Sequence, residues 1–317
     1  MRTPLIAVIL LHAVPAAADR PVHTFSIVAR DPVTGDLGVA VQSHWFSVGA
    51  VVTWAEPGVG AVATQSFVEQ SYGPLGLTLM RAGKGAKEAL EGLVAADAGR
   101  DVRQVAFVDA TGQVATHTGK SCIAAAGHEA GESFSVQANM MEKPTVWPAM
   151  AKAYRNTKGD LAERMLAALD AAEAEGGDIR GRQSAAILIV SGKPSGKPWA
   201  GRLFDLRVDD HPKPLVELRR LVKLQRAYNH MNAGDLAVEH KDNEAALREY
   251  KAAAALVPDN DEMVYWHAVA LVGMGKTDDA MPMFKKLFAK EPRWRELTRR
   301  LPASGLMPEE TARKITQ

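Results

Sequence analysis

Pairs of apolar strands joined by short turns most constrain how the first two thirds of this chain can fold. HTFSIVARDPVTGDLGVAVQS, residues 23–43, predicts two strands around a turn at 31–36. VRQVAFVDATGQVATHTG, residues 102–119, repeats this plan around 109–112. Strands joined by such short turns pair antiparallel. We expect further strands in GAVVTWA, GVGAVATQ, FSVQANMM, SAAILIVSG and RLFDLRVDD.

Two helical stretches interrupt these strands. Residues 72–95 and 144–174 carry apolar side chains at helical spacing. They stand between runs of strands and do not follow each strand in turn, which argues against a regular β-α-β alternation. The pattern predicts an α+β domain over residues 23–212, in which sheet stacks on sheet with helices outside.

After Pro212 the pattern becomes purely helical, and it repeats at an offset of 34 residues. A small residue, Gly234 or Ala268, precedes each of two matching windows. This spacing resembles the tetratricopeptide repeat, a unit of two helices. We therefore expect a small all-α domain over 213–317 that binds a protein partner or a second copy, with a generic helical bundle as the alternative. The matched positions are Ala246, Tyr250, Ala253 and Pro258 in the first window and Ala280, Phe284, Leu287 and Pro292 in the second.

Residues 1–18 have the three-part order of a secretory signal peptide. Arg2 supplies the positive charge, residues 5–11 are an unbroken apolar run, and residues 16–18 are all alanine. The apolar run is too short for a membrane-spanning helix, which needs about 20 residues. A buried N-terminal helix or strand is the alternative. The signal predicts an exported protein, periplasmic in a Gram-negative cell.

The charge balance argues against a nucleic-acid partner. The chain has 38 basic and 37 acidic residues, a net charge of +1, whereas nucleic-acid binders usually show a basic patch and a basic isoelectric point. Cleavage after Ala18 removes one basic residue and leaves 37 of each sign. No other stretch is long and apolar enough for a membrane span.

Neither a metal site nor a cofactor is expected from the sequence. Cys122 is the only cysteine, and no histidine pair has the spacing of a zinc-binding helix. A lone cysteine among small apolar residues is typical of packing. GMGKT at 273–277 resembles the end of a phosphate-binding loop, but Ala270 stands where that motif requires glycine. We interpret Gly275 as a turn residue between two helices.

Several separated motifs in the first domain occur in the order of a known family. They are HTFSIVARDPVTGDLGVAVQS, VGAVVTWAEPGVGAVATQSF, SYGPLGL, GRQSAA and LRVDDHP. Over residues 23–215 the chain resembles the domain of unknown function 1028 family, which is assigned to the N-terminal-nucleophile hydrolase superfamily. The resemblance implies an αββα sandwich and fixes no substrate. Many members begin Met-Thr-Phe-Ser, so the matching residue here is Thr24, although residues 19–23 precede it after the signal.

An N-terminal threonine can carry out hydrolysis with its own amine. A threonine hydroxyl is a weak nucleophile that needs a nearby base. A free α-amino group has a pKa of about 7.7–8.0, so part of it is neutral near pH 7 and can accept the hydroxyl proton. Thr24 gains that amine only if residues 19–23 are also removed. Otherwise its nitrogen is an amide, and Thr24 is a β-branched strand residue.

The expected hairpin places other candidates beside Thr24. If the hairpin closes symmetrically about residues 33–34, Thr24 lies opposite Ser43, with Gln42 and His44 beside it. We take Ser43 as a catalytic candidate and Gln42 as a substrate-binding candidate.

Two amide side chains and one arginine complete the candidate site. Gln65 and Asn139 each end or interrupt an apolar strand, so they could donate to an oxyanion. Structural hydrogen bonds are the alternative for both, because buried amides need partners. Arg182 lies in the GRQSAA motif and is a substrate-binding candidate through the family resemblance.

Two functions compete at this stage. The first is an exported amidohydrolase that acts on a small amide or peptide-like bond with Thr24 as nucleophile. The second is a non-catalytic binding protein that keeps the sandwich fold and recruits a partner through its repeats. A mature N-terminus at Thr24 favours the enzyme, whereas one at Asp19 favours the binding protein.

Overall fold

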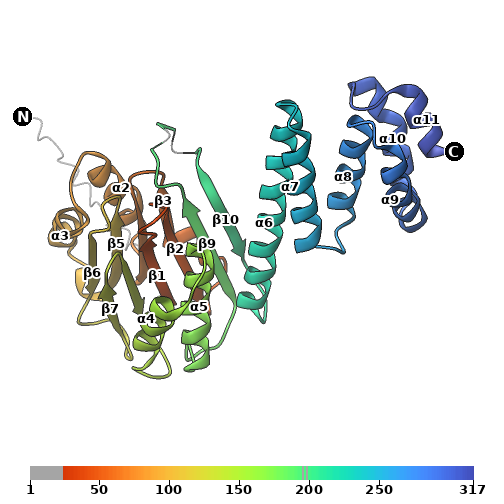
Figure 1. Cartoon of the computed structure of the whole chain (residues 1–317). Coiled ribbons are helices and arrows are strands. Elements are labelled where there is room, and N and C mark those ends of the chain that lie inside the picture. The colour runs from red at the N-terminus through yellow and green to blue at the C-terminus, as the bar shows by residue number, and fades with distance from the viewer. Residues whose placement is uncertain (1–23, 195, 198) are drawn as a thin grey trace, which may run out of the picture. The chain divides into compact units, whose positions relative to one another are not determined.

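The computed structural model describes residues 24–194, 196–197 and 199–317, so the expected signal peptide lies outside the described residues. Contacts divide the chain into two compact units, of which the first ends at Leu215 and the second is Val216–Gln317. Figure 1 shows the strands in the first part of the chain and only helices in the last part. The two units are described separately below.

The larger sheet of the first unit has six antiparallel strands in the order β10-β9-β2-β1-β8-β7. Strand β1 therefore lies in the interior of the sheet, and six of its seven residues are buried. The strands are β1 (Thr24–Arg30), β2 (Leu37–Ser43), β7 (Gly127–Gly131), β8 (Phe134–Ala138), β9 (Ser184–Val190) and β10 (Arg202–Val208).

A second sheet of four antiparallel strands, in the order β3-β4-β5-β6, packs against the first. Helices α4 and α5 cover the outer side of the larger sheet, and α2 and α3 cover the smaller one (Figure 1). The first unit is thus layered helix, sheet, sheet, helix. These elements are β3 (Thr53–Glu56), β4 (Gly60–Ser66), β5 (Arg103–Asp109), β6 (Val114–Thr118), α2 (Tyr72–Arg81), α3 (Ala86–Ala96), α4 (Val146–Asn156) and α5 (Leu161–Ala174).

The alternation of side chains along β2 shows how the layers are built. Val39 and Val41 belong to the apolar core between the sheets, together with Ala61 and Ala63 of the smaller sheet. Gly38 points the other way, because a Cβ there would come within 2.9 Å of the Met165 sulfur on α5. Odd-numbered residues of β2 therefore face the second sheet, and even-numbered residues face α5.

The structure differs from the local predictions, or adds to them, at three places. Gly49–Val52 of the expected GAVVTWA strand forms the short helix α1, where a Cβ on Gly49 would lie 2.4 Å from that of Ala186. The predicted helical segment 72–95 contains two helices, separated where Gly83 adopts a φ of +91°. Strand β7 was missed because GHEAG has no apolar run, and its half-exposed edge position requires none.

The second unit consists of helices and shows the predicted repeat packing. Ala246, Tyr250 and Ala253 are buried on α7, and Ala280, Phe284 and Leu287 are buried on α9. Gly275 has a φ of +75° between α8 and α9, as expected for a turn glycine. The helices are α6 (Pro214–Glu239), α7 (Asn243–Leu256), α8 (Asp261–Gly273), α9 (Thr277–Lys290), α10 (Arg293–Arg300) and α11 (Glu309–Thr316), with a short 3₁₀ turn at Leu301–Ser304; a second 3₁₀ turn, Arg100–Val102, belongs to the first unit. Across the described part of the chain, no helix is long and apolar enough to cross a membrane.

Candidate functional site

Thr24 and Ser43 face each other across β1 and β2, as the hairpin arithmetic predicted. The Thr24 hydroxyl donates to the Ser43 hydroxyl over 3.2 Å, and both residues are fully buried. The Thr24 carbonyl accepts from the Asn139 backbone N–H over 3.1 Å, so the backbone of Thr24 bonds toward β8. Thr24 and Ser43 are therefore a non-hydrogen-bonded pair of the antiparallel ladder. In such a pair the two side chains lie closer together than in a hydrogen-bonded pair.

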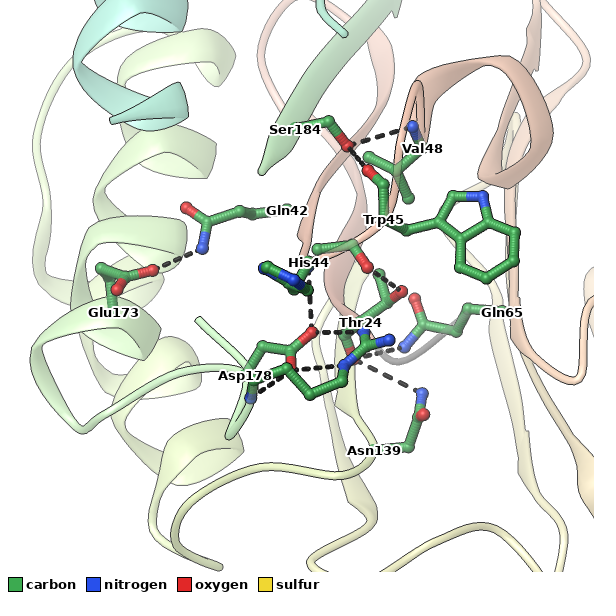
Figure 2. Close-up of polar contacts among 12 residues, drawn as sticks. Thr24, Gln42, His44, Trp45, Val48, Gln65, Asn139, Glu173, Asp178 and Ser184 are labelled. Atoms are coloured by element: carbon green, nitrogen blue, oxygen red, sulfur yellow. Dashed lines mark hydrogen bonds and ion pairs between the residues drawn. The ribbon is translucent and has the colours of Figure 1, made fainter. Parts of the chain in front are cut away.

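Gln65 and Asn139 hold the Thr24 carbonyl (Figure 2). Gln65 Nε2 donates to the Thr24 carbonyl oxygen over 3.2 Å, and Asn139 Nδ2 donates to it over 3.4 Å. Both amides also donate to Gln104 Oε1, over 2.8 and 2.9 Å. These are the structural hydrogen bonds expected as the alternative to oxyanion donation, and they fix the first residue of β1 in place.

Neutral polar side chains continue from these amides between the two sheets. Ser26 Oγ donates to Gln65 Oε1 over 2.6 Å, and Gln137 Nε2 donates to Ser26 Oγ over 2.6 Å. Gln104 Nε2 donates to the Ala138 carbonyl over 2.9 Å. Buried amides are tolerated because they bond one another, and such a network fixes the relative position of the strands that carry it. Gln104 and Gln137 were missed, although each interrupts an apolar strand, the signal that identified Gln65.

Left-handed backbone follows both amide residues that hold Thr24. Ser66, directly after Gln65, has a φ of +72°, and Met140, directly after Asn139, has a φ of +55°. This conformation is uncommon outside glycine and is often found at functional sites. Asn139 Oδ1 is buried and has no hydrogen-bond partner within the described part of the chain. The end of the sandwich at Thr24 thus combines left-handed backbone with an unpaired buried oxygen.

Gln42 and Arg182 meet on the opposite side of the larger sheet. Gln42 Nε2 donates to one carboxylate oxygen of Glu173 on α5, and Arg182 Nε donates to the other. Even-numbered Gln42 faces α5, while Ser43 faces the second sheet with Thr24. The structure therefore brings Thr24, Ser43, Gln65 and Asn139 together and separates Gln42 and Arg182 from them by the sheet.

A buried carboxylate organises the loop next to the Thr24 end of β2. Asp178 accepts from the His44 backbone N–H over 3.0 Å and pairs with the Arg180 guanidinium at 2.7 Å. Gln183 N donates to the Ser43 carbonyl over 3.1 Å. The loop after α5 is thus attached to the end of β2 (Figure 2). The sequence placed His44 beside Thr24 but gave no sign of Asp178, because their contact joins two loops 134 residues apart.

The remaining reactive groups are Cys122 and the side chains that could bind a metal. The described residues contain no group of three or more His, Cys, Asp or Glu side chains that could hold a metal ion. Cys122 donates to the Arg103 carbonyl over 3.3 Å. Burial raises the pKa of the Cys122 thiol, which lowers its thiolate fraction near neutral pH. This environment agrees with a packing role.

The protein is thus of the α+β class: a helix-sheet-sheet-helix domain followed by helical repeats. A buried threonine begins an interior strand of its larger sheet. The chain belongs to the family of unknown function DUF1028, whose model matches residues 24–218. A tetratricopeptide repeat model matches residues 237–301. Both family resemblances are therefore confirmed.

One solved structure is a clear relative of this chain. Protein SPO2555 from Silicibacter pomeroyi, also assigned to DUF1028, is 31% identical with a TM-score of 0.56. The match covers 68% of this chain and 92% of that one. No curated protein matches the chain.

Proposed function

We propose that this protein is an exported amide hydrolase of the N-terminal-nucleophile type, in which Thr24 becomes the first residue by removal of everything before it. The observation that carries the proposal is the placement of Thr24. It begins an interior strand, its hydroxyl bonds Ser43, and Gln65 and Asn139 hold its carbonyl. The family match also begins at residue 24. The signal-like order of residues 1–18 supports export, to the periplasm in a Gram-negative cell.

The reaction needs only the freed amine and the hydroxyl of Thr24. The neutral amine accepts the hydroxyl proton, and the Thr24 oxygen bonds to the carbonyl carbon of the substrate amide. The carbon–nitrogen bond then breaks, the proton passes to the departing amine, and an ester on Thr24 remains. Water adds to the acyl carbon and returns one proton to the Thr24 oxygen. A carboxylic acid leaves, and the free hydroxyl is restored.

The surrounding residues act in this proposal by positioning Thr24. Ser43 orients the hydroxyl from across the hairpin. Gln65 and Asn139 hold the backbone carbonyl, and either amide would have to leave that carbonyl before it could donate to an oxyanion. Gln42 and Arg182 lie on the α5 side of the larger sheet. The sheet therefore separates them from a substrate that is bound at the Thr24 hydroxyl.

A non-catalytic binding protein is the second candidate. The complete burial of Thr24 and the engagement of both amide side chains favour it, because an unprocessed chain keeps a hydroxyl that substrate cannot reach. In either case the tetratricopeptide-like repeats indicate protein interaction, since stacked repeats present an extended binding surface. The partner is a protein or a second copy of the chain.

The mature N-terminus and the Thr24 hydroxyl together test the proposal. We expect intact-mass measurement of the exported protein to find a chain that begins at Thr24. That form should hydrolyse small amides, Thr24→Ser should retain activity, and Thr24→Ala should lose it while keeping the circular dichroism spectrum. Full turnover by Thr24→Ala, or by a chain verified to begin at Asp19, would exclude the mechanism. A native chain that begins at Asp19 and binds without turnover would favour the binding protein.

A further inference from the structure

Large apolar side chains are exposed around the end of the sandwich that holds Thr24. Phe46 is 65% exposed, Ile179 is 62% exposed and Ile123 is 36% exposed. We call these three side chains the apolar rim. Val33, which is also exposed, lies in the turn at the other end of β1. A cluster of exposed apolar groups beside a candidate site often marks a ligand surface.

Backbone hydrogen bonds connect two members of the rim to the Thr24 site. Met140 N donates to the Ile123 carbonyl over 2.8 Å, and Ile179 N donates to the Met140 carbonyl over 3.3 Å. Met140 directly follows Asn139, which holds the Thr24 carbonyl. Ile123 and Ile179 therefore flank the residue next to Asn139, whose left-handed backbone turns the chain at this point.

Phe46, the third member of the apolar rim, lies in the turn after β2, and this turn is bonded to the loop that carries Ile179. Phe46 lies three residues after Ser43, and the Ser184 hydroxyl bonds the carbonyl of Trp45 just before it. Trp45 itself packs against the apolar core between the sheets. The His44 N–H bonds Asp178, the residue directly before Ile179. The Phe46 turn and the Ile179 loop are thus held together.

Two arginines close to the rim are already paired. Arg180 bonds Asp178, and Arg182 bonds Glu173. Neither cation is therefore available to bind an anionic substrate without breaking an ion pair, which costs free energy when one partner is as buried as Asp178. The rim is apolar and the two arginines close to it are paired, which favours an uncharged apolar ligand over an anionic one.

We propose that the apolar rim binds the acyl part of the amide substrate, so that the substrates of this site are amides of apolar carboxylic acids. This inference rests on the proposed hydrolysis at Thr24. The acyl carbon must reach the Thr24 oxygen, and an apolar chain attached to that carbon then lies against Phe46, Ile123 and Ile179. The amine part of the substrate departs in the first step, so the rim selects through the acyl group.

Acyl p-nitroanilides test this specificity. In the chain that begins at Thr24, we expect kcat/KM for the hexanoyl anilide to exceed that for the acetyl anilide by about tenfold or more, since each buried methylene contributes to discrimination. The succinyl anilide, which carries a carboxylate, should be poorer than the hexanoyl one. Phe46→Ser and Ile179→Ser should each reduce the hexanoyl-to-acetyl ratio several-fold. Val33→Ser is the matched control, because Val33 is 91% exposed at the other end of β1 and should leave the ratio unchanged.

A binding measurement separates this proposal from the proposed hydrolysis. The same anilides are titrated into the Thr24→Ala chain by calorimetry, where no turnover is needed. Tighter binding of the hexanoyl than of the acetyl anilide, with loss of that preference in Phe46→Ser and Ile179→Ser, supports the rim even if no form of the protein is active. Equal affinities for the two anilides, or a preference that both rim variants retain, would overturn it. Equal rates of hydrolysis for the acetyl and hexanoyl anilides would overturn the proposal that the rim binds the acyl group. The proposed hydrolysis at Thr24 would still be supported.

Discussion

Thr24 and Ser43 form a cross-strand pair of hydroxyl groups, with their oxygens 3.2 Å apart, inside the sandwich. Ser43 is paired in turn with Ser184 on β9, so three hydroxyl residues lie in a row across three neighbouring strands. Ser184 is occupied elsewhere, because it donates to the Trp45 carbonyl and accepts from Val48 N over 3.1 Å. The hydroxyl of Ser43 is therefore the member of the row that contacts Thr24 directly.

This pair leads to a prediction for Ser43→Ala. In the chain that begins at Thr24, loss of the Ser43 hydroxyl should lower kcat by 10- to 100-fold, on the order expected when a reacting group is misoriented. KM should change little, since Ser43 is a positioning residue. Ser184→Ala is the control, because the Ser184 hydroxyl contacts the turn after β2 and not Thr24. This variant should lower thermal stability and leave kcat unchanged. Steady-state kinetics on one amide substrate check both variants, and an unchanged kcat in Ser43→Ala would exclude the positioning role.

The amide network predicts a large cost for Gln104→Leu. The substitution keeps the volume but removes the acceptor shared by Gln65 Nε2 and Asn139 Nδ2. Leaving buried donors short of a partner should lower the free energy of unfolding by about 3 kcal/mol. Gln70→Leu, at an exposed position shortly before α2, should cost less than about 0.5 kcal/mol. Urea unfolding followed by circular dichroism measures both, and equal costs would contradict a structural role for the network.

The pairing of Thr24 with Ser43 could be predicted because turn length alone sets the register of a hairpin. Gln65 and Asn139 could be predicted because a buried amide in an apolar strand needs a partner. That Gln104 is their shared partner could not be predicted, because its position in an apolar strand marks it as a buried amide but does not indicate which strands face it. Gln42, grouped with Thr24 as a substrate-binding candidate, lies on the opposite face of β2 by the same alternation, and its partner Glu173 comes from a helix 131 residues away.

Long-range packing explains the remaining differences between prediction and structure. GAVV has the composition of a strand, but Gly49 lies so close to Ala186 that the segment forms a helical turn instead. Asp178 gives no signal by itself, because its role depends on the end of β2 folding back to it. Local pattern therefore predicted the elements and one register, whereas the contacts between loops required the assembled sandwich.

Burial of Cys122 predicts slow reaction of its thiol. Its raised pKa leaves less thiolate at pH 8, and the thiolate is the reactive form. Alkylation by iodoacetamide at pH 8 should therefore be about tenfold slower than that of glutathione or more. Mass spectrometry at timed intervals measures the rate, and urea-unfolded protein provides the control in which the rate should recover. Folded protein that reacts as fast as unfolded protein would contradict the packing role.

Asp97 predicts a loss of stability at acid pH. Burial opposes its ionisation, but hydrogen bonds from Arg103, the Gly99 N–H and Tyr72 together hold the pKa of this carboxyl below its ordinary value. A group whose pKa is lowered by folding contributes stability above the pKa of the unfolded chain, about 3.9, and loses it as pH falls through the folded value. The midpoint of thermal unfolding should thus be lower in Asp97→Asn at pH 7, and the difference should shrink toward pH 3.

The exposed pair of Asp101 and Lys120 provides the control for Asp97. The two side chains are 3.1 Å apart and largely in solvent. Exposed ion pairs contribute little to stability, so Asp101→Asn should leave the unfolding midpoint almost unchanged across the same pH range. If the difference in unfolding midpoint between Asp97→Asn and the parent chain were constant from pH 7 to pH 3, ionisation of Asp97 would not be the cause of that difference.

Two glycines in the helical unit predict opposite effects for the same substitution. A Cβ on Gly234 would lie 2.8 Å from the ring of Tyr250, whose hydroxyl is held by Asp235 over 2.7 Å. The ring cannot move away without breaking that bond, so Gly234→Ala should destabilise the unit by about 1–3 kcal/mol despite alanine's better helix propensity. Gly273 at the end of α8 has nothing within 4 Å of a Cβ position, so Gly273→Ala should stabilise it by about 0.5–1 kcal/mol. Thermal unfolding followed at 222 nm measures both variants in the full chain. Shifts of the same sign would show that the close approach of Gly234 and Tyr250 does not hold the repeat together.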